Sequence, residues 1–192
     1  MILKNNAILN LISTLENKGV IKGIKKVEFK KNQNIVSANK YLKQVYIIKT
    51  GVAKCVINEE NDKNFLIEFL GEGEIIGEIE AILGFKTMTT VVAMTEIVAF
   101  NIELSSFKEL LTTNREFNNQ LLAELANRLR LTGLRSSYQQ LNTIENSLSK
   151  ILHLLKEQSL ELSKKELAEY LGISLRSLNR ELQKLSNTPK LI

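Results

Sequence analysis

The residues of this sequence best suited to a chemical task lie in the segment 162–185. Ser163 and Glu166 stand three positions apart, which is the spacing of a helix capping box. Gly172 can adopt the left-handed conformation that a tight turn between two helices requires. The segment therefore predicts a helix-turn-helix, with a short first helix that ends near Gly172 and a second helix that begins after Ser174.

The second of these helices has an apolar side and a polar side. Its apolar side would pack inward through Leu178, Leu182 and Leu185. Because arginine can donate two hydrogen bonds to guanine in the major groove, Arg176 and Arg180 are candidates for reading bases. Ser174, Ser177 and Lys184 suit phosphate contacts better. The full predicted DNA-binding set is Ser174, Arg176, Ser177, Asn179, Arg180 and Lys184. We predict double-stranded DNA as the partner; the alternative is a plain helical hairpin with solvated charges.

Composition excludes several other classes of function. The 192 residues are 44% hydrophobic and 24% charged, and the formal net charge of +5 permits a nucleic-acid partner without requiring one. Cys55 is the only cysteine and His153 the only histidine. This excludes a disulfide framework, a cysteine-ligated cluster and the histidine-rich metal centre of a cupin enzyme. We expect no metal, no cofactor and no enzyme activity, and we interpret Cys55 as a buried small hydrophobe rather than a thiol switch.

The sequence also bears on localisation. No apolar run approaches the roughly 20 residues that span a bilayer. The first residues, 1–15, mix apolar side chains with asparagines and do not resemble a signal peptide. We therefore expect a cytoplasmic protein with no membrane partner.

The pattern of apolar residues changes halfway along the chain. In the segment 24–102, short β-branched and aromatic runs are separated by turn residues about every 8–12 positions, which predicts an antiparallel sandwich or barrel. From Ser105 the periodicity is helical, and the segment 115–141 predicts a helix about 27 residues and roughly 40 Å long. A second helix is expected over 144–157. We divide the chain into a β domain (1–108), a long helix (109–142) and a helix-turn-helix domain (143–192).

A helix this long on a small protein usually packs along a partner, and a two-fold homodimer is the commonest arrangement. The alternative is a helix that lies across its own β domain. The residues predicted to form the dimer contact recur at helical spacing: Phe117, Leu121, Leu125, Leu129 and Thr132.

This organisation resembles the cyclic-AMP receptor and FNR superfamily of bacterial transcription regulators. The resemblance covers about 24–192 and is carried by Tyr-Ile-Ile-Lys-Thr-Gly at 46–51, by Leu-Gly-Glu-Gly-Glu-Ile-Ile-Gly-Glu-Ile at 70–79, and by the helix-turn-helix. It implies an α+β protein with an N-terminal antiparallel β-roll (a jelly roll of the cyclic-nucleotide-binding type), a long dimerisation helix and a C-terminal DNA-binding domain. Relatives usually continue into a β-hairpin wing, whose start here would be 189–192, so we expect the wing to be incomplete.

The resemblance also implies an effector site, with Gly77, Glu78, Lys86, Thr87 and Thr132 as its candidates. The family holds its cyclic phosphate with an arginine followed by Ser or Thr, but the matching segment 84–90 has no arginine. Lys86 supplies a charge without the two-pronged geometry of a guanidinium. We expect a regulator that does not respond to cyclic AMP and takes another small effector, a peptide-like effector or none. The alternative is a small-molecule-binding module whose helical tail serves protein partners.

Overall fold

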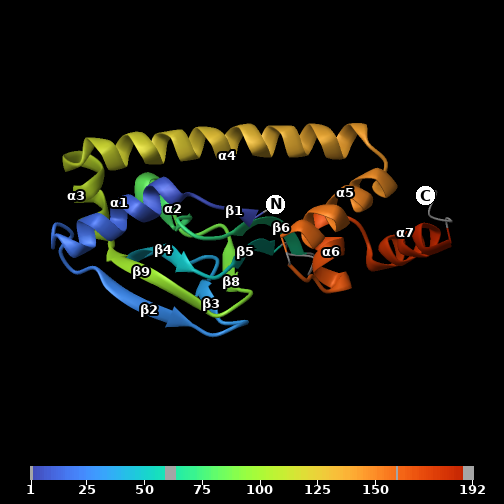
Figure 1. Ribbon diagram of the computed structural model, residues 1–192, viewed down its shortest axis with the longest axis horizontal. Coiled ribbons are helices and arrows are strands. Elements are labelled where there is room, and N and C mark those ends of the chain that lie inside the picture. The colour runs from blue at the N-terminus through green and yellow to red at the C-terminus, as the bar shows by residue number, and fades with distance from the viewer. Residues whose placement is uncertain (1, 59–63, 159, 188–192) are drawn as a thin grey trace.

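The computed structural model describes residues 2–58, 64–158 and 160–187. Strands occupy the first half and helices the second (Figure 1). The elements are β1 (Ile2–Leu3), α1 (Asn6–Asn17), β2 (Lys25–Phe29), β3 (Asn34–Val36), β4 (Gln44–Thr50), β5 (Ala53–Asn58), β6 (Asn64–Leu70), β7 (Ile75–Ile76), α2 (Glu78–Leu83), β8 (Thr90–Ala93), β9 (Ile97–Glu103), α3 (Leu104–Thr113), α4 (Arg115–Leu141), α5 (Ile144–Glu157), α6 (Lys164–Leu171) and α7 (Leu175–Asn187).

The strands form two sheets packed face to face. One sheet has the order β1-β6-β5-β8-β3 and the other β2-β9-β4-β7, and the pairs are antiparallel except for β1 with β6. Alternate side chains of both sheets, such as Ile48, Ala53 and Ala99, fill the space between them. The predicted β-roll and the α+β fold class are therefore confirmed.

The second sheet is buried on its outer face as well. There Val45, Ile47 and Phe100 pack beneath α1, α3 and α4 in one continuous core. A strand buried on both faces needs apolar side chains at successive positions rather than at alternate ones. This accounts for the unbroken apolar run at 45–48 in β4.

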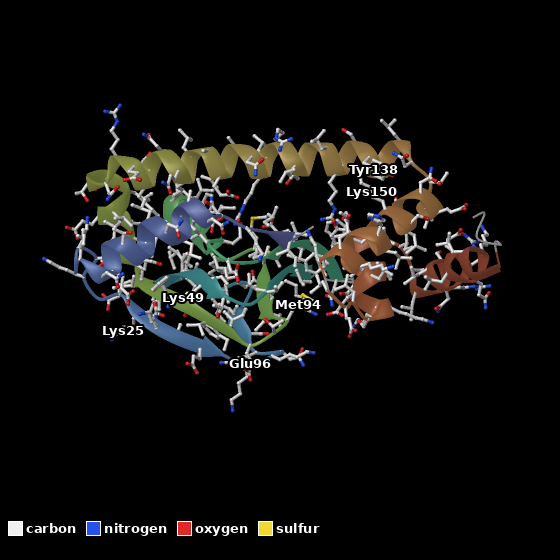
Figure 2. The ribbon with its side chains drawn as sticks, in the orientation of Figure 1. Lys25, Lys49, Met94, Glu96, Tyr138 and Lys150 are labelled. Carbon is white, nitrogen blue, oxygen red and sulfur yellow. The ribbon has the colours of Figure 1, made fainter. Side chains whose placement is uncertain are left out.

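The long predicted helix is confirmed as α4, which follows the capping residue Asn114 and runs along the whole β domain (Figure 1). The Asn114 side chain caps it by accepting a 2.9 Å hydrogen bond from the backbone N–H of Phe117. At its other end the ammonium of Lys150 in α5 lies 4.0 Å from the ring centroid of Tyr138, and Figure 2 shows these two side chains together. This contact holds α5 against the end of α4.

The helix-turn-helix is also confirmed. Ser163 and Glu166 form the capping box at the start of α6, and Gly172 ends that helix with φ of 68°. Leu148 and Ile151 of α5 pack with Leu167 and Leu178 in a separate small core. Two helices of the β domain, α1 and α2, were not anticipated from the sequence. The predicted start of the wing at 189–192 lies outside the described residues.

Gly73 provides a test of how the N-terminal segment is attached. Its φ is 81°, and an added Cβ would overlap the carbonyl oxygen of Asn5. We expect Gly73→Ala to lower the free energy of unfolding by about 3 kcal/mol, because a backbone clash adds to the cost of a left-handed residue. Gly84→Ala is the control: its φ is 76°, but no atom lies within 4 Å of the added Cβ. Gly84→Ala should lower the free energy of unfolding by only about 1 kcal/mol, and urea titration of both variants measures the two values. Equal losses of stability in the two variants would contradict the close approach of Gly73 to Asn5.

Candidate DNA-binding surface and effector site

The predicted DNA-binding residues lie on or next to α7. Ser174 caps this helix, since its hydroxyl accepts a 3.1 Å hydrogen bond from the backbone N–H of Ser177. Leu178 is fully buried and fixes the inner side of the helix. Arg176, Arg180 and Lys184 follow one another at intervals of four and are all exposed. The structure thus brings the predicted cations together in one row along α7.

Glu181 belongs to the same surface but was not among the predicted residues. Its carboxylate pairs with Arg180 at 3.2 Å and with Lys184 at 3.1 Å. Hydrogen bonds from Lys184 and Arg180 hold the pKa of this carboxyl below its usual value. The spacing of three between Glu181 and Lys184 is a sequence signal for that pair, whereas the adjacent Arg180 gives no such signal. Glu181 therefore orients two of the three cations in the row.

The helix-turn-helix domain is docked on the outer face of the first sheet. Phe69 of β6 stacks on Tyr170 of α6, with 5.5 Å between ring centroids. Arg135 of α4 lies over the same Tyr170 ring at 4.0 Å. Its guanidinium donates hydrogen bonds to the backbone carbonyls of Leu66, at 3.0 Å, and Ile67 in β6, and to that of Tyr170 at 2.7 Å. One arginine thus joins the long helix, the β domain and the helix-turn-helix domain.

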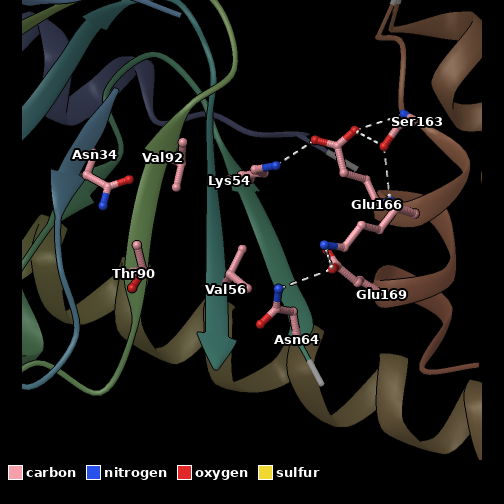
Figure 3. Close-up of a pocket in the computed structure, with 10 residues that line it drawn as sticks. Asn34, Lys54, Val56, Asn64, Thr90, Val92, Ser163, Glu166 and Glu169 are labelled. Carbon is pink, nitrogen blue, oxygen red and sulfur yellow. Dashed lines mark hydrogen bonds and ion pairs between the residues drawn. The ribbon is translucent and has the colours of Figure 1, made fainter. Parts of the chain in front are cut away.

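Polar contacts line a cavity of about 410 Å³ beside this junction (Figure 3). Lys54 of β5 binds Glu166 at 2.6 Å, and the Asn64 side chain of β6 donates to Glu169 at 3.3 Å. Burial works against ionisation of Glu166, but hydrogen bonds from Lys54 and Ser163 outweigh it and lower its pKa. Glu166, which completes the capping box of α6 with Ser163, therefore also ties α6 to the β domain.

A cluster of charged side chains is buried where α4 crosses the β domain. It consists of Arg128 and four carboxylates, and we call Glu68, Glu74, Glu78, Glu124 and Arg128 the Arg128 cluster. The guanidinium lies 2.5 Å from the carboxylate of Glu74 and 2.6 Å from that of Glu78. These two glutamates are only 1% and 3% exposed, respectively. Glu124 lies 3.3 Å away and Glu68 3.9 Å away. Sequence reasoning missed this cluster, although Glu124 and Arg128 have the spacing of a helical ion pair.

Burial dominates the electrostatics of the Arg128 cluster. It raises the pKa of both Glu74 and Glu78 to about 7, although Arg128 acts in the opposite direction. For Arg128 itself burial would lower the pKa, but Glu78, Glu68 and Glu74 outweigh it and raise the pKa above its usual value. One guanidinium cannot neutralise four carboxylates, so the ionised cluster carries an excess of negative charge.

The structure disperses the predicted effector residues. Gly77 has φ of 94° and precedes α2, and Glu78 follows it into the Arg128 cluster. The Thr87 hydroxyl donates to the carbonyl of Ser37 at 2.7 Å and accepts from the backbone N–H of Lys40. Lys86 lies over the ring of Tyr41, 5.5 Å from its centroid, and Thr132 is exposed on α4. Of these candidates, Glu78 is the one that enters a buried charged site.

The predicted dimer residues divide into two groups. Phe117 and Leu121 are buried in the chain's own core, and Leu125 packs against that core. Leu129 and Thr132 are exposed, and Leu129 is 77% accessible. The other exposed residues beside Leu129 on α4 alternate at intervals of three and four, and they are Leu122, Ala126, Gly133 and Ser136. The helix therefore lies across its own β domain with one side and presents a narrow apolar stripe with another.

The remaining sequence-based candidates have ordinary environments. Cys55 is 7% exposed in the sandwich core, and burial raises the pKa of its thiol to about 12. The thiolate needed for oxidation is therefore disfavoured. His153 is exposed on α5 and lies 3.5 Å from Glu157. Among the described residues, no group of His, Cys, Asp or Glu is arranged to hold a metal, and no helix is long and apolar enough to cross a membrane.

The fold and these contacts define a β-roll joined by a long helix to a helix-turn-helix. Residues 26–114 match the family model of the cyclic nucleotide-binding domain. The chain is 24% identical over 153 residues to the cAMP-activated global transcriptional regulator CRP of Escherichia coli and of Shigella flexneri, covering 74% of this chain and 72% of the relative. The predicted resemblance to CRP/FNR regulators is therefore confirmed.

Two solved structures show the same architecture over most of the chain. The c-di-GMP responsive global regulator CLP of Xanthomonas campestris superposes with a TM-score of 0.80 at 18% identity, and 91% of each chain is covered. A CRP/FNR-family transcriptional regulator of Thermus thermophilus gives a TM-score of 0.74 at 16% identity, with 86% of this chain and 87% of that chain covered. At these identities the likeness establishes the fold.

Arg135→Lys should loosen the DNA-binding domain. A lysine cannot stack flat on Tyr170 while donating to three carbonyl groups, because its ammonium is a single point. We expect amide hydrogen exchange in β6 and α6 to rise about tenfold while the sandwich core keeps its protection. Arg130→Lys, at an exposed position of the same helix, is the control. Unchanged exchange at Tyr170 in the Arg135 variant would show that Arg135 does not hold this junction.

Proposed function

We propose that this protein is a cytoplasmic, dimeric transcription regulator that binds double-stranded DNA through α7, with the β domain in a sensory or modulatory role. The observation that carries the proposal is the row of exposed cations on α7. Arg176, Arg180 and Lys184 stand on a helix whose opposite side is anchored by Leu178. A helix whose inner side is packed against the domain and whose exposed side is positively charged suits insertion into a major groove. The relatives named above are themselves transcription regulators.

The apolar stripe on α4 supports a homodimer. Leu122 and Leu129 are 65% and 77% exposed and stand one heptad apart. Ala126 and Gly133 lie between and beyond them on the same side, and small residues there allow two helices to approach closely. Two α4 helices paired along this stripe would place two α7 helices for half-sites about 34 Å apart on one face of the duplex.

The environment of Glu78 argues against a response to cyclic AMP. A carboxylate that is to bind a ribose hydroxyl must be free to accept a hydrogen bond, but Glu78 is occupied by Arg128 at 2.6 Å. The Thr87 hydroxyl is likewise engaged with Ser37 and Lys40, and Lys86 lies over Tyr41. The arginine at this position, Arg128, is already paired with carboxylates, so a cyclic phosphate would meet an excess of negative charge.

The competing function is a small-molecule-binding module whose helical tail serves protein partners. The interdomain cavity beside Lys54 and Glu166 is the feature that favours it. The two functions differ in what the α7 cations do. If the tail serves proteins alone, removing these cations leaves DNA affinity unchanged.

Fluorescence anisotropy with a pool of palindromic duplexes tests the DNA-binding proposal. Titrations at two salt concentrations, with and without cyclic AMP, should show sequence-selective binding that ignores the nucleotide. We expect Arg176→Ala/Arg180→Ala to weaken selective binding at least tenfold, since a base-reading arginine contributes about 1–3 kcal/mol. The control, Lys108→Ala/Lys156→Ala, removes two exposed charges outside α7 and should have a much smaller effect. Binding that requires cyclic AMP would contradict our interpretation of Glu78.

Sedimentation equilibrium tests the proposed dimer stripe. Leu129→Glu places a charge at its centre and should shift the protein to monomer, because a carboxylate buried between two helices has no partner. Leu134→Glu alters another exposed leucine on a different side of α4 and should leave the dimer intact. If Leu129→Glu remains dimeric, the two copies pair through another surface.

A further inference from the structure

We propose that the Arg128 cluster is a proton-binding site. Through this site the pH of the surrounding solution determines how firmly α4 is held on the β domain, and so regulates DNA binding. The inference rests on the proposed function for its DNA readout. Its chemical part, the uptake of a proton by buried carboxylates, stands on the geometry of the cluster alone.

The Arg128 cluster contains a buried carboxylate oxygen that lacks a hydrogen bond. One carboxylate oxygen of Glu74 binds Arg128, but the other has no hydrogen-bond partner among the described residues, although Glu74 is only 1% exposed. A buried ionised oxygen without a donor is costly, whereas a protonated carboxyl is far less so. The site is therefore built in a way that favours an added proton.

The charges of the Arg128 cluster are also unbalanced, since four carboxylates surround one guanidinium. Glu68 reaches Arg128 from β6, Glu74 from the turn before β7, Glu78 from α2 and Glu124 from α4. Among the residues that the structure describes, Arg128 is the one cation ion-paired with these carboxylates. Arg135 of α4 makes no ion pair with the cluster, but its charge interacts with that of Glu68. Other groups that act on the cluster are Glu80 of α2, Cys55 of β5 and the neutral amide of Asn5, which donates to Glu124 at 2.7 Å.

These two features determine the direction of the response. Glu74 and Glu78 have pKa values of about 7 in the folded protein, against an ordinary value of 4.5. The folded state therefore binds more protons than the unfolded state between these values, so stability falls as pH rises through this window. Below about pH 6 the cluster is relieved of repulsion and holds α4, and above about pH 8 its ionised carboxylates repel one another and loosen it.

The helix transmits this change to the DNA-binding domain. Arg128 and Arg135 stand seven residues apart, and both point into the β domain. Arg135 is the residue that binds the backbone of Leu66, Ile67 and Tyr170. When α4 is held less firmly at Arg128, these contacts of Arg135 weaken and α6 and α7 become less ordered. DNA affinity then falls, because ordering α6 and α7 again costs free energy.

The sequence leaves the relevant pH range almost free of other titrating side chains. His153 is the only histidine, and burial raises the pKa of the Cys55 thiol to about 12. A His153→Gln protein is therefore a suitable parent for the experiment. In that parent, ¹³C NMR of the glutamate carboxyl groups would report proton binding, and anisotropy with a selected duplex would report DNA affinity.

We expect two glutamate carboxyls of the parent to titrate between about pH 6 and about pH 8, and DNA affinity to fall at least fivefold over this range, as for a coupling of about 1 kcal/mol or more. Glu78→Gln keeps the shape of the side chain and mimics its protonated form, so its DNA affinity should stay high and change little with pH. Glu74→Gln should behave in the same way. Glu72→Gln removes a carboxylate that pairs with exposed Lys4 at 3.1 Å, and it should respond like the parent.

Two results would overturn the proposal. If every glutamate titrates below about pH 5.5, as an ordinary exposed carboxyl does, the cluster is not a proton site. If Glu78→Gln and Glu74→Gln keep the pH dependence of the parent, protons act on DNA binding elsewhere. Titration near neutrality in a protein that binds no duplex at any pH would support the proton site and overturn the proposed function with its regulatory link.

Discussion

A guanidinium that is removed from water must be surrounded by acceptors, and this requirement organises the molecule around Arg128. Its partners come from β6, from the turn before β7, from the start of α2 and from α4 itself. Asn5 adds the N-terminal segment, because it caps α1 with one end of its side chain and donates to Glu124 with the other. Elements far apart in sequence are thus fixed to the long helix at one buried point. The apolar core beneath α4 buries the inner side of the helix, and the Arg128 cluster fixes where the helix lies on the β domain.

The long helix makes three kinds of contact, two through its sides and one through its C-terminal end. One side meets the chain's own core through Phe117 and Leu121, and continues through Arg128 to Arg135. A second side bears the exposed leucine stripe, which we assign to a partner copy. Its C-terminal end holds α5 through Tyr138 and Lys150. Because all three belong to one rigid element, the proposed regulation would act through α4 on both the proposed dimer contact and the helix-turn-helix domain.

The likeness to cyclic-nucleotide-binding domains and the chemistry of this site differ in an informative way. The turn at Gly77 and the buried Glu78 are present, so the backbone frame of such a site is retained. Its interior is occupied by Arg128 from the same chain and by carboxylates in excess. A fold can keep its frame while the side chains within it change, because the frame depends on apolar burial and glycine turns, and ligand choice depends on a few charges.

The sequence by itself determined the features that depend on local spacing. The capping box of Ser163 and Glu166, the turn at Gly172, the extent of α4 and the cations of α7 all follow from residues close together in the chain. Only the tertiary structure decided which side of α4 faces inward, so that Phe117 and Leu121 proved to be core residues and not exposed dimer contacts. It alone brought Glu68, Glu74 and Glu78 to Arg128, and Tyr170 to Arg135. Helical periodicity shows that a helix has an apolar side, but the choice among neighbouring sides depends on the total burial of all elements together, which no local pattern contains.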